Sequence, residues 1–422
     1  MSETTPLRIL SIYRRCYPEV TGGGHIYLYQ VARRLSRRGH DVHILASSSN
    51  PQVAPYEFKD DLHWHRFYAP PSNPLMEHLR YIKETYSIAS RLHQEKPFDI
   101  INLHGPRMTL RLCSSSLFDD AAFVFTFHAD RAYEQIWDAK KNLTLNPSPL
   151  QYFRYCTVDG ALYRFYHHIT RRALERSDAI VVLSDYVKSI IDRHYGSEHL
   201  SKITKIYSGV DTERFKPVED KKDARRRLGL PTEKTIFLTI RRLVPRMGLF
   251  NLLEAIRILS DKYPKASDAL FIIGGSGPLK TKLERRTRKR GLQGTVKITG
   301  YIPEEELSLY YQAADCFVLP TEELEGFGIV SIEALSSGIP VIATPSAASG
   351  ETVGRFFPDF ICKSHHPDDI AATLMDYLSR NPTTVPDATE CREIVLQHYS
   401  WDFIIPQIES LFVQTVKKRR AS

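Results

Sequence analysis

The stretch TIFLTIRRLVPRMGLFNLLEAIRIL (235–259) decides the fold class, because it joins a strand pattern to a helix pattern through a short arginine-rich loop. Its beginning, TIFLTI, is rich in apolar and β-branched residues and predicts a short strand. Its end, NLLEAIRIL, repeats apolar residues at helical spacing and predicts a helix. A strand followed by such a helix is the building unit of a parallel α/β sheet.

The same alternation continues on both sides of this stretch. The strands predicted after it are ALFIIG (269–274), TVKITG (295–300), CFVLPT (316–321) and PVIAT (340–344). The strands predicted before it are RILSIY (8–13), DVHILA (41–46), FDIINLH (98–104), FVFTFH (123–128), DAIVVLS (178–184) and KITKIY (202–207). We therefore predict an α/β protein of two doubly wound, Rossmann-like domains that face each other across a cleft.

The boundary between the two domains is predicted at the segment SGVDTERFKP (208–217). This segment has turn-forming residues and a closing proline but no strand or helix period, so we expect it to be the linker. The N-terminal domain then covers 1–207 and the C-terminal domain 218–398. The pattern is helical near the end of the chain, and we expect a last helix within 399–422 to pack back on the N-terminal domain. Ligands bind beyond the carboxyl ends of parallel strands, so the site is expected between the domains.

The composition is that of a folded globular chain, with 422 residues of which 42% are hydrophobic and 25% charged. The longest apolar stretches, such as 121–127, are far shorter than the ~18 residues of a membrane-spanning helix. The beginning of the chain shows no signal-peptide pattern. The six cysteines are scattered without a CxxC pair, and no histidine or cysteine stands at metal-ligand spacing. We therefore expect a cytoplasmic protein with reduced thiols and no structural zinc.

The formal net charge of +8 is concentrated in the first half of the chain. Residues 1–207 hold 27 basic and 21 acidic residues, which is a net charge of +6. This weakly basic domain suits phosphate-bearing ligands or peripheral contact with an anionic membrane face, and the simpler alternative is a solvated surface. No nucleic-acid-binding motif accompanies the charge, so we expect no nucleic-acid partner.

The strongest chemical motif of the C-terminal domain is EGFGIVSIE (325–333). Two glycines in three residues at a strand-to-helix turn expose backbone N–H groups, which suit a phosphate or a sugar hydroxyl. Glu325 lies in the turn and Glu333 about two helical turns later, and a carboxylate can accept hydrogen bonds from both hydroxyls of a ribose. For Glu333 alone, an ordinary surface position is the simpler interpretation.

Three further features lie where predicted strands end. The loop RRLVPRMGL (241–249) holds three arginines and predicts an anion site, with a solvated basic loop as the alternative. The loop GGSGP (274–278) is best interpreted as a tight turn. In the N-terminal domain, Gly22, Gly23 and Gly24 precede a helix, which is compatible with an anion site or a flexible turn. His128 ends a strand there and is a candidate hydroxyl-binding group, as, more weakly, is His104.

Together these residues resemble the retaining glycosyltransferases of the GT-B fold in glycosyltransferase family 4, also called group 1 glycosyltransferases. The resemblance extends over nearly the whole chain. It is carried by PEVTGGGHIYLYQVARRLSRRGHDV (18–42), SDAIVVLSDYVKSII (177–191), IYSGVDTERFKP (206–217), RRLVPRMGL (241–249), GGSGP (274–278), EGFGIVSIEALSSGIPVIAT (325–344) and YSW (399–401). It implies transfer of a sugar from a nucleotide diphosphate sugar to the hydroxyl of a sugar, lipid-linked or small-molecule acceptor, with no cofactor besides the donor.

The resemblance also implies roles for single residues. It puts Glu325 near the hydroxyls of the donor sugar and Glu333 on the ribose, with backbone contacts to sugar and phosphate from Gly326, Phe327, Gly328 and Ile329. It puts Arg242 on the diphosphate and His128 at the transferred sugar. The remaining donor-binding residues implied by the family are Gly23 and Gly24 on the phosphate side and Tyr301 and Ile302 at the nucleobase.

One departure from the family pattern concerns the charge on the leaving group. The family commonly has a lysine where this chain has Met247, and we expect the neighbouring Arg246 to supply the missing charge. The family's GGxPE-type loop is also only loosely matched, by SGETVG (349–354). The alternatives to an active enzyme are a non-catalytic nucleotide-sugar-binding or regulatory subunit and, with less support, a sugar-nucleotide epimerase.

The reaction is expected to need no metal ion. The sequence shows no DxD-type carboxylate pair at a predicted strand end, and its adjacent aspartate pairs, 60–61, 119–120 and 368–369, are interpreted as surface residues. Arginines and helix N-termini can neutralise a diphosphate in place of a cation.

Overall fold

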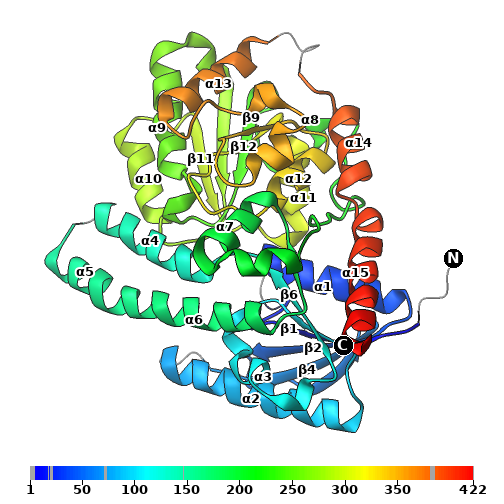
Figure 1. Ribbon diagram of the computed structural model, residues 1–422. Coiled ribbons are helices and arrows are strands. Elements are labelled where there is room, and N and C mark those ends of the chain that lie inside the picture. The colour runs from blue at the N-terminus through cyan, green and yellow to red at the C-terminus, as the bar shows by residue number, and fades with distance from the viewer. Residues whose placement is uncertain are drawn as a thin grey trace. The chain divides into compact units, whose positions relative to one another are not determined.

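The computed structural model (Figure 1) describes most of the chain. The described residues are 5–17, 19, 22–70, 74–145, 147–380 and 385–421. They form two compact units, each of which is built around its own sheet. Unit 1 comprises Met1–Gln135, Cys156–Tyr207 and Ile404–Ser422, and unit 2 comprises Ile136–Tyr155 and Ser208–Phe403.

The strands of unit 1 form one eight-stranded sheet in the order β3-β4-β2-β1-β5-β6-β7-β8. Only β3 runs antiparallel to its neighbour. Because β1, β5 and β6 are adjacent and parallel, the residues that follow them gather at one edge of the sheet. The strands are β1 (Arg8–Ile12), β2 (Asp41–Ser48), β3 (Tyr56–Lys59), β4 (Leu62–Tyr68), β5 (Ile100–Leu103), β6 (Ala122–Phe127), β7 (Ala179–Val182) and β8 (Ile203–Lys205).

The hairpin of β3 and β4 is the part of this sheet that the sequence analysis missed. The strand β4, LHWHRFY, mixes histidine, tryptophan and arginine, and β3 is the short run YEFK, so neither reads as an apolar strand. Asp60 and Asp61 form the turn between them with φ angles of 56° and 65°. Both residues are exposed, as predicted, and their left-handed conformations are those of a two-residue hairpin turn.

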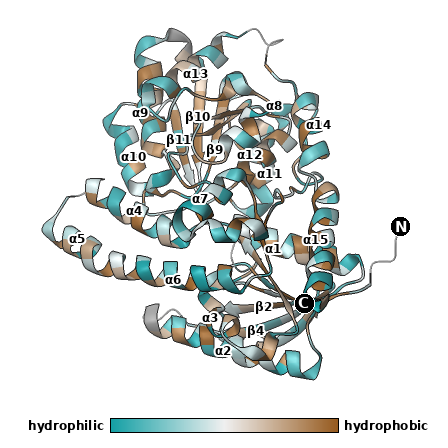
Figure 2. Cartoon of the chain, in the orientation of Figure 1, coloured by the Kyte–Doolittle hydropathy of each residue, from teal (hydrophilic) through white to brown (hydrophobic). Residues whose placement is uncertain are grey.

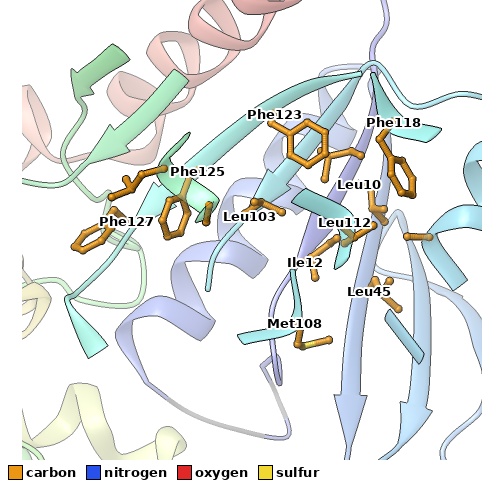
Figure 3. Packing of buried hydrophobic residues seen from close by; sticks show 14 of the residues in the cluster. Leu10, Ile12, Leu45, Leu103, Met108, Leu112, Phe118, Phe123, Phe125 and Phe127 are labelled. Carbon is orange, nitrogen blue, oxygen red and sulfur yellow. The ribbon is translucent and has the colours of Figure 1, made fainter. Parts of the chain in front are cut away.

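The core of unit 1 covers one face of its sheet with residues two positions apart in each strand (Figure 3). Leu10 and Ile12 come from β1, and Phe123, Phe125 and Phe127 come from β6. Each of these five side chains is at most 2% exposed. Close packing of this kind holds the strand ends of β1 and β6 in fixed positions, and the candidate site residues of unit 1 follow these ends.

Unit 2 has a five-stranded, fully parallel sheet in the order β11-β10-β9-β12-β13. Figure 2 shows mainly apolar residues along its strands and hydrophilic ones along α10. The neighbouring strands β9 and β12 place the loops that follow them side by side at the carboxyl edge. The strands are β9 (Thr235–Ile240), β10 (Ala269–Gly274), β11 (Val296–Gly300), β12 (Cys316–Leu319) and β13 (Val341–Ala343).

The helices alternate with these strands along the chain. They are α1 (Gly23–Arg37), α2 (Pro74–Glu95), α3 (Leu110–Cys113), α4 (Arg131–Leu145), α5 (Pro149–Arg154), α6 (Gly160–Arg176), α7 (Asp185–Tyr195), α8 (Lys221–Arg227), α9 (Leu249–Lys262), α10 (Lys280–Lys289), α11 (Glu304–Ala313), α12 (Ile329–Ser336), α13 (Pro367–Ser379), α14 (Ala388–His398) and α15 (Trp401–Ala421). Within the described ranges, none of these helices combines the length and the apolar character needed to cross a membrane.

The division of the chain differs from the predicted domain ranges in two segments. The segment Cys156–Tyr207 belongs to unit 1 and the segment Ser208–Phe403 to unit 2, and residues 136–155 also belong to unit 2. Of the predicted terminal segment, 404–422 belong to unit 1. There Glu409 of α15 accepts hydrogen bonds from Arg38, at 2.8 Å, and from His40, at 2.9 Å.

Candidate functional site

The loops after β9 and β12 meet through Arg241, whose side chain is 3% exposed. Its Nη1 donates to Thr321 Oγ1 at 2.5 Å and its Nη2 donates to Glu325 Oε2. Burial, together with the positive charges of Arg242 and Arg246, lowers the pKa of Arg241 to about 9. The guanidinium therefore remains protonated at neutral pH, and three arginines act on one another electrostatically at this edge of the sheet.

The other two arginines of the loop differ in their exposure. Arg242 is exposed, whereas Arg246 is only 1% exposed and donates from Nη1 to Asp138 Oδ2 at 2.7 Å. The predicted contact of Arg246 with a diphosphate stays a prediction, because in this structure that Nη1 contacts a carboxylate. Met247 is also buried, which keeps the side chain at the family's lysine position away from solvent.

Asp138 and Lys141 explain why the second half of α4 belongs to unit 2. Asp138 pairs with Arg246, and Lys141 Nζ lies 2.6 Å from Glu322 Oε2 in the loop after β12. Sequence analysis assigned no role to either residue, because the ion pairs join positions more than 100 residues apart. The only local signal was the presence of both charges three positions apart, which places them on one side of a helix.

The glycine-rich turn precedes α12 as predicted. Gly328 is the residue before the helix and has a φ of 79°, a left-handed conformation that favours glycine. Gly326 and Ile329 are half-buried, and Phe327 is buried with its ring 5.8 Å from that of Tyr399. No acidic residue lies in the first turn of α12, so its N-terminal N–H groups are a favourable position for an anion.

Glu333 is buried rather than a surface residue, so the simpler interpretation from sequence is wrong. It is 6% exposed, and Tyr311 Oη donates to its Oε2 at 2.8 Å. Burial raises the pKa of Glu333 to about 7, although the Tyr311 hydrogen bond and the charge of Arg214 act in the opposite direction. A buried carboxylate of this kind forms strong hydrogen bonds when its partners are hydroxyl groups.

The predicted nucleobase contacts follow β11. Tyr301 is 60% exposed and Ile302 is buried. A side chain on Gly274 would approach Ile302 Cδ1 to 2.5 Å, so the GGSGP loop packs against this residue. In the same loop Gly275 has a φ of 125°, and a Cβ there would lie 1.8 Å from the carbonyl oxygen of Arg241. The glycines of this loop therefore serve close backbone packing, in agreement with the tight-turn interpretation.

In unit 1, Gly24 and His128 lie together at the carboxyl edge of the sheet. A Cβ on Gly24 would be 2.9 Å from Tyr13 Oη and 3.5 Å from the His128 ring, so a larger residue there would displace the Tyr13 hydroxyl. Gly23 begins α1, and no acidic residue lies in the first turn of that helix. The structure thus places Gly24 beside His128.

A chain of hydrogen bonds behind His128 sets its tautomer. Thr126 Oγ1 donates to Asn102 Oδ1 at 3.2 Å, and Asn102 Nδ2 lies 2.8 Å from His104 Nε2. His104 Nδ1 in turn lies 3.0 Å from His128 Nε2. An amide nitrogen only donates, so His104 accepts at Nε2 and donates from Nδ1. His128 then accepts at Nε2 and keeps its own proton on Nδ1.

Both histidines of this chain are neutral at physiological pH. Burial, with a smaller effect of the charge of His128, lowers the pKa of His104 well below its usual value. Burial and the charge of His25 lower the pKa of His128 to about 3. His128 can therefore donate one hydrogen bond from Nδ1 to a hydroxyl or ether oxygen, but it carries no charge there.

Family models match both units in turn. The model described as Glycosyltransferase Family 4 matches residues 21–214, and the model described as Glycosyl transferases group 1 matches residues 220–393. Together they cover most of the chain, including the glycine-rich turn and the loop that contains Arg241.

Curated relatives match over a little more than half of the chain. A GDP-mannose-dependent alpha-(1-6)-phosphatidylinositol monomannoside mannosyltransferase of Mycobacterium tuberculosis is 28% identical over 57% of this chain and 63% of its own length. A D-inositol 3-phosphate glycosyltransferase of Corynebacterium urealyticum is 29% identical over 57% of this chain and 58% of its own length. The chain thus spans about three fifths of these curated relatives.

Solved structures share the fold over almost the whole chain. Sucrose-phosphate synthase from Thermosynechococcus elongatus has a TM-score of 0.78 at 20% identity, and covers 98% of this chain and 100% of its own. Anabaena HepE in complex with UDP-glucose has a TM-score of 0.70 at 17% identity, with the same coverage. The chain belongs to the group 1 glycosyltransferases of family 4 and has the GT-B architecture of two Rossmann-like α/β units.

Proposed function

We propose that the protein is a retaining, metal-independent glycosyltransferase that moves a sugar from a nucleotide diphosphate sugar to an acceptor hydroxyl. The observation that carries this proposal is the meeting of Arg241 and Glu325, which joins the arginine-rich loop to the glycine-rich turn at the start of α12. Cations, exposed N–H groups and carboxylates at one strand edge suit the diphosphate, sugar and ribose of one donor molecule.

In this proposal unit 2 binds the donor. Arg242 and the N-terminus of α12 contact the diphosphate, Glu325 accepts from hydroxyls of the sugar, and Glu333 accepts from hydroxyls of the ribose. Arg246 and the buried Arg241 add positive charge behind these groups. The leaving diphosphate gains negative charge as the glycosidic bond breaks, so fixed cations that bind it more tightly in the transition state accelerate the reaction.

Unit 1 supplies the groups that contact the transferred sugar. His128 donates from Nδ1 to a sugar oxygen, and the N-terminus of α1 at Gly23 and Gly24 binds the phosphate side. We propose that water is excluded from the bound donor during transfer, which limits hydrolysis. Departure and attack on the same face of the sugar would then retain its configuration.

The names of the relatives suggest a first choice of substrates. The mycobacterial mannosyltransferase uses GDP-mannose, and both curated relatives are named for acceptors that contain inositol. HepE was solved with UDP-glucose. We propose a hexose donor of this kind, and as acceptor a hydroxyl of a polyol such as inositol, either free or carried on a lipid.

A lipid-borne acceptor would require contact with a membrane surface, and α5 is the proposed place of contact. Leu150, Tyr152 and Phe153 are 77%, 61% and 65% exposed, and Arg154 adds a positive charge beside them. Exposed apolar residues next to cations favour an anionic lipid surface. Sedimentation with phosphatidylglycerol vesicles should retain the wild-type protein and release Phe153→Ser.

The proposed reaction is tested with the purified full chain. Each of GDP-mannose, UDP-glucose and ADP-glucose is incubated with inositol 3-phosphate or a phosphatidylinositol acceptor, and mass spectrometry detects the new glycoside. NMR of the anomeric proton then reports retention or inversion. Arg242→Ala should abolish product, whereas Arg285→Ala, an exposed arginine of α10, should leave it unchanged. Absence of product with every pair, or an inverted product, would contradict the proposal.

Two observations also favour the non-catalytic alternative. Met247 is buried where the family has a lysine, and Arg246 is paired with Asp138. A silent nucleotide-sugar-binding subunit would show donor-induced thermal stabilisation without transfer, and Met247→Lys could then restore turnover. An epimerase would convert the donor sugar without any acceptor, which the same mass-spectrometric and NMR assay detects.

A further inference from the structure

A cluster of histidines lies at the opposite end of the unit 1 sheet from His128. Asp41 and His43 stand two residues apart at the start of β2, and His63 and His65 stand two residues apart at the start of β4. The parallel register pairs His43 with His63, so these side chains share one face of the sheet. Sequence analysis found no metal-ligand spacing, because it did not recognise β4 as a strand.

We propose that Asp41, His43 and His63 form a zinc-binding site. One ligand atom from each of them lies within 4.8 Å of the other two. Asp41 Oδ1 is 3.0 Å from His43 Nε2 and 3.6 Å from His63 Nε2. Ligand atoms at the usual zinc distances of about 2.0–2.1 Å are roughly 3.3 Å apart in a tetrahedral site, and the two observed distances bracket this value.

The two oxygens of the Asp41 carboxylate have different partners. Arg8 Nε lies 3.1 Å from Oδ2, and Lys96 Nζ lies 3.7 Å from the same oxygen. Both imidazoles face Oδ1 instead. Oδ1 is therefore the oxygen available to a cation, while Arg8 holds the carboxylate in place through Oδ2.

Both histidines are also supported through their second ring nitrogen. His43 Nδ1 lies 2.9 Å from His65 Nε2, and His63 Nδ1 lies 3.0 Å from Tyr56 Oη. Such hydrogen bonds commonly fix the orientation and tautomer of metal-binding histidines. In the structure, His43 Nε2 donates to Asp41 Oδ1, because a carboxylate only accepts. A zinc ion would displace this proton, and His43 would then keep a single proton on Nδ1, donated to His65 Nε2.

The site is partly exposed and offers three protein ligands, which suits a zinc ion whose fourth ligand is water. The side chains of Asp41 and His63 are each 33% exposed, while His43 is 7% exposed. Two imidazoles and one carboxylate leave a fourth position to solvent. A bound ion would connect β2 to β4 and thereby stabilise the edge of the sheet that carries the missed hairpin.

Two features of the site lower the affinity that we expect. The rings of His43 and His63 stack at 4.5 Å with planes 15° apart, so both must turn about χ2 for their lone pairs to converge on one ion. The charges of Arg8 and Lys96 also repel a cation. We therefore expect weaker binding than at a closed site with four protein ligands.

Titration of zinc chloride into the chelator-treated full chain, followed by calorimetry, tests the proposal. We expect one equivalent of zinc per chain, a rise in melting temperature, and the visible spectrum of four-coordinate cobalt when cobalt replaces zinc. His43→Gln and His63→Gln should each weaken zinc binding by about tenfold or more. His168→Gln, at an exposed histidine of α6, is the matched control and should bind as the wild type does.

Two results would overturn the site. The first is no saturable binding by a folded wild-type chain, as judged by circular dichroism. The second is wild-type zinc affinity in the His43→Gln and His63→Gln double variant, which would assign the ion to other residues. Asp41→Asn provides a variant that keeps the size of the side chain if a histidine variant fails to fold, and it should also bind zinc at least about tenfold more weakly.

Discussion

The candidate site residues of unit 1 and those of unit 2 are different kinds of polar group. In unit 1, His128 ends a chain of neutral hydrogen-bonding groups, and burial lowers the pKa of both histidines in that chain far below physiological pH. In unit 2, Arg241 and Glu325 form a buried ion pair, and Arg246 forms another with Asp138. The neutral groups suit sugar hydroxyls, whereas the charged groups suit a diphosphate.

This difference follows from what each part of a donor needs. A sugar carries no charge before the reaction. A neutral hydrogen-bond donor with a fixed tautomer, such as His128, can therefore orient the sugar without binding anions in its place. A diphosphate is charged throughout, and fixed cations in a buried loop interact with it more strongly than solvated ones do. We therefore expect variants of the neutral groups in unit 1 and variants of the charged groups in unit 2 to change activity in different ways.

The largest effect is expected from Arg246→Ala. If its charge acts on the departing diphosphate, loss of a charge-assisted interaction costs about 3 kcal/mol in the transition state, and turnover falls more than a hundredfold. Asp138→Asn is the matched control, because it weakens the ion pair and keeps the arginine charge. Steady-state kinetics and melting temperatures are measured for both variants.

The comparison of these two variants decides what Arg246 does. A purely structural arginine would give equal losses of turnover and of melting temperature in both. Turnover that stays at the wild-type level in a folded Arg246→Ala would remove this residue from the charged half of the site. Met247→Lys should change the turnover of an active enzyme little.

Glu333→Gln is expected to separate stability from donor binding. The pKa of Glu333 is raised to about 7, above its usual value near 4.3, so its ionisation opposes folding. The protonated carboxyl of Glu333 contributes to the free energy of unfolding. This contribution is fully present below about pH 4 and is lost as the pH rises through 7. Glutamine does not ionise, so Glu333→Gln should increase the free energy of unfolding at pH 8 by up to ~3 kcal/mol, with little change at pH 4.

The same substitution should weaken donor binding, because an amide replaces one carboxylate oxygen that we assign to the ribose. Urea unfolding at both pH values and donor titration by calorimetry measure the two effects. Glu305→Gln, at an exposed position of α11, is the control. An equal change in stability at pH 4 and pH 8 would contradict the assignment of this titration to Glu333.

Glu325→Gln should act on turnover more than on donor affinity. Its carboxylate accepts from Arg241, and a charged hydrogen bond contributes about 1.5–3 kcal/mol, so turnover should fall by tens of fold. The KM for the donor should change little, because backbone groups of the turn and Glu333 remain. Kinetics with wild-type turnover and KM would show that Glu325 supports the fold and not the reaction.

His104→Phe tests the neutral half of the site. It removes the partner of His128 Nε2 at similar volume, so the tautomer of His128 is no longer fixed. We expect a loss of about 1 kcal/mol, which is roughly fivefold in turnover, and a mixed tautomer signal in the ¹⁵N NMR spectrum of His128. His168→Phe is the control. An unchanged tautomer would show that Asn102 and His104 do not position this histidine.

Much of the fold could be predicted from sequence because buried parallel strands are short apolar runs. The strands 235–240 and 269–274 agree with the prediction residue for residue. The hairpin of β3 and β4 could not be predicted in this way, because β4 mixes histidine, tryptophan and arginine. Arg66 breaks the alternation that Leu62 and Trp64 begin, and a short polar run without a clear period is equally compatible with a loop.

The candidate site divides in the same way. Motifs that are continuous in sequence, such as the glycine-rich turn before α12, could be located from the sequence, and the roles of their residues stay predictions. Contacts between distant positions could not, and these include Asp138 with Arg246 and Tyr311 with Glu333. The hydrogen bond of Tyr311 to Glu333 joins two different helices, which no local pattern records.

The smallest effect is expected from chelation, which should change the rate of sugar transfer by less than about twofold. In unit 2 the diphosphate charge can be met by Arg242, Arg246 and the N-terminus of α12, so a divalent cation has no further charge to neutralise. Among the described residues, the only group of three or more acidic, histidine or cysteine residues close enough to hold an ion is that of Asp41, His43 and His63, which belongs to unit 1. EDTA should therefore lower the melting temperature of a zinc-loaded chain and leave turnover unchanged. If EDTA abolished transfer and magnesium or manganese restored it, the charged half of the site would need a metal ion after all.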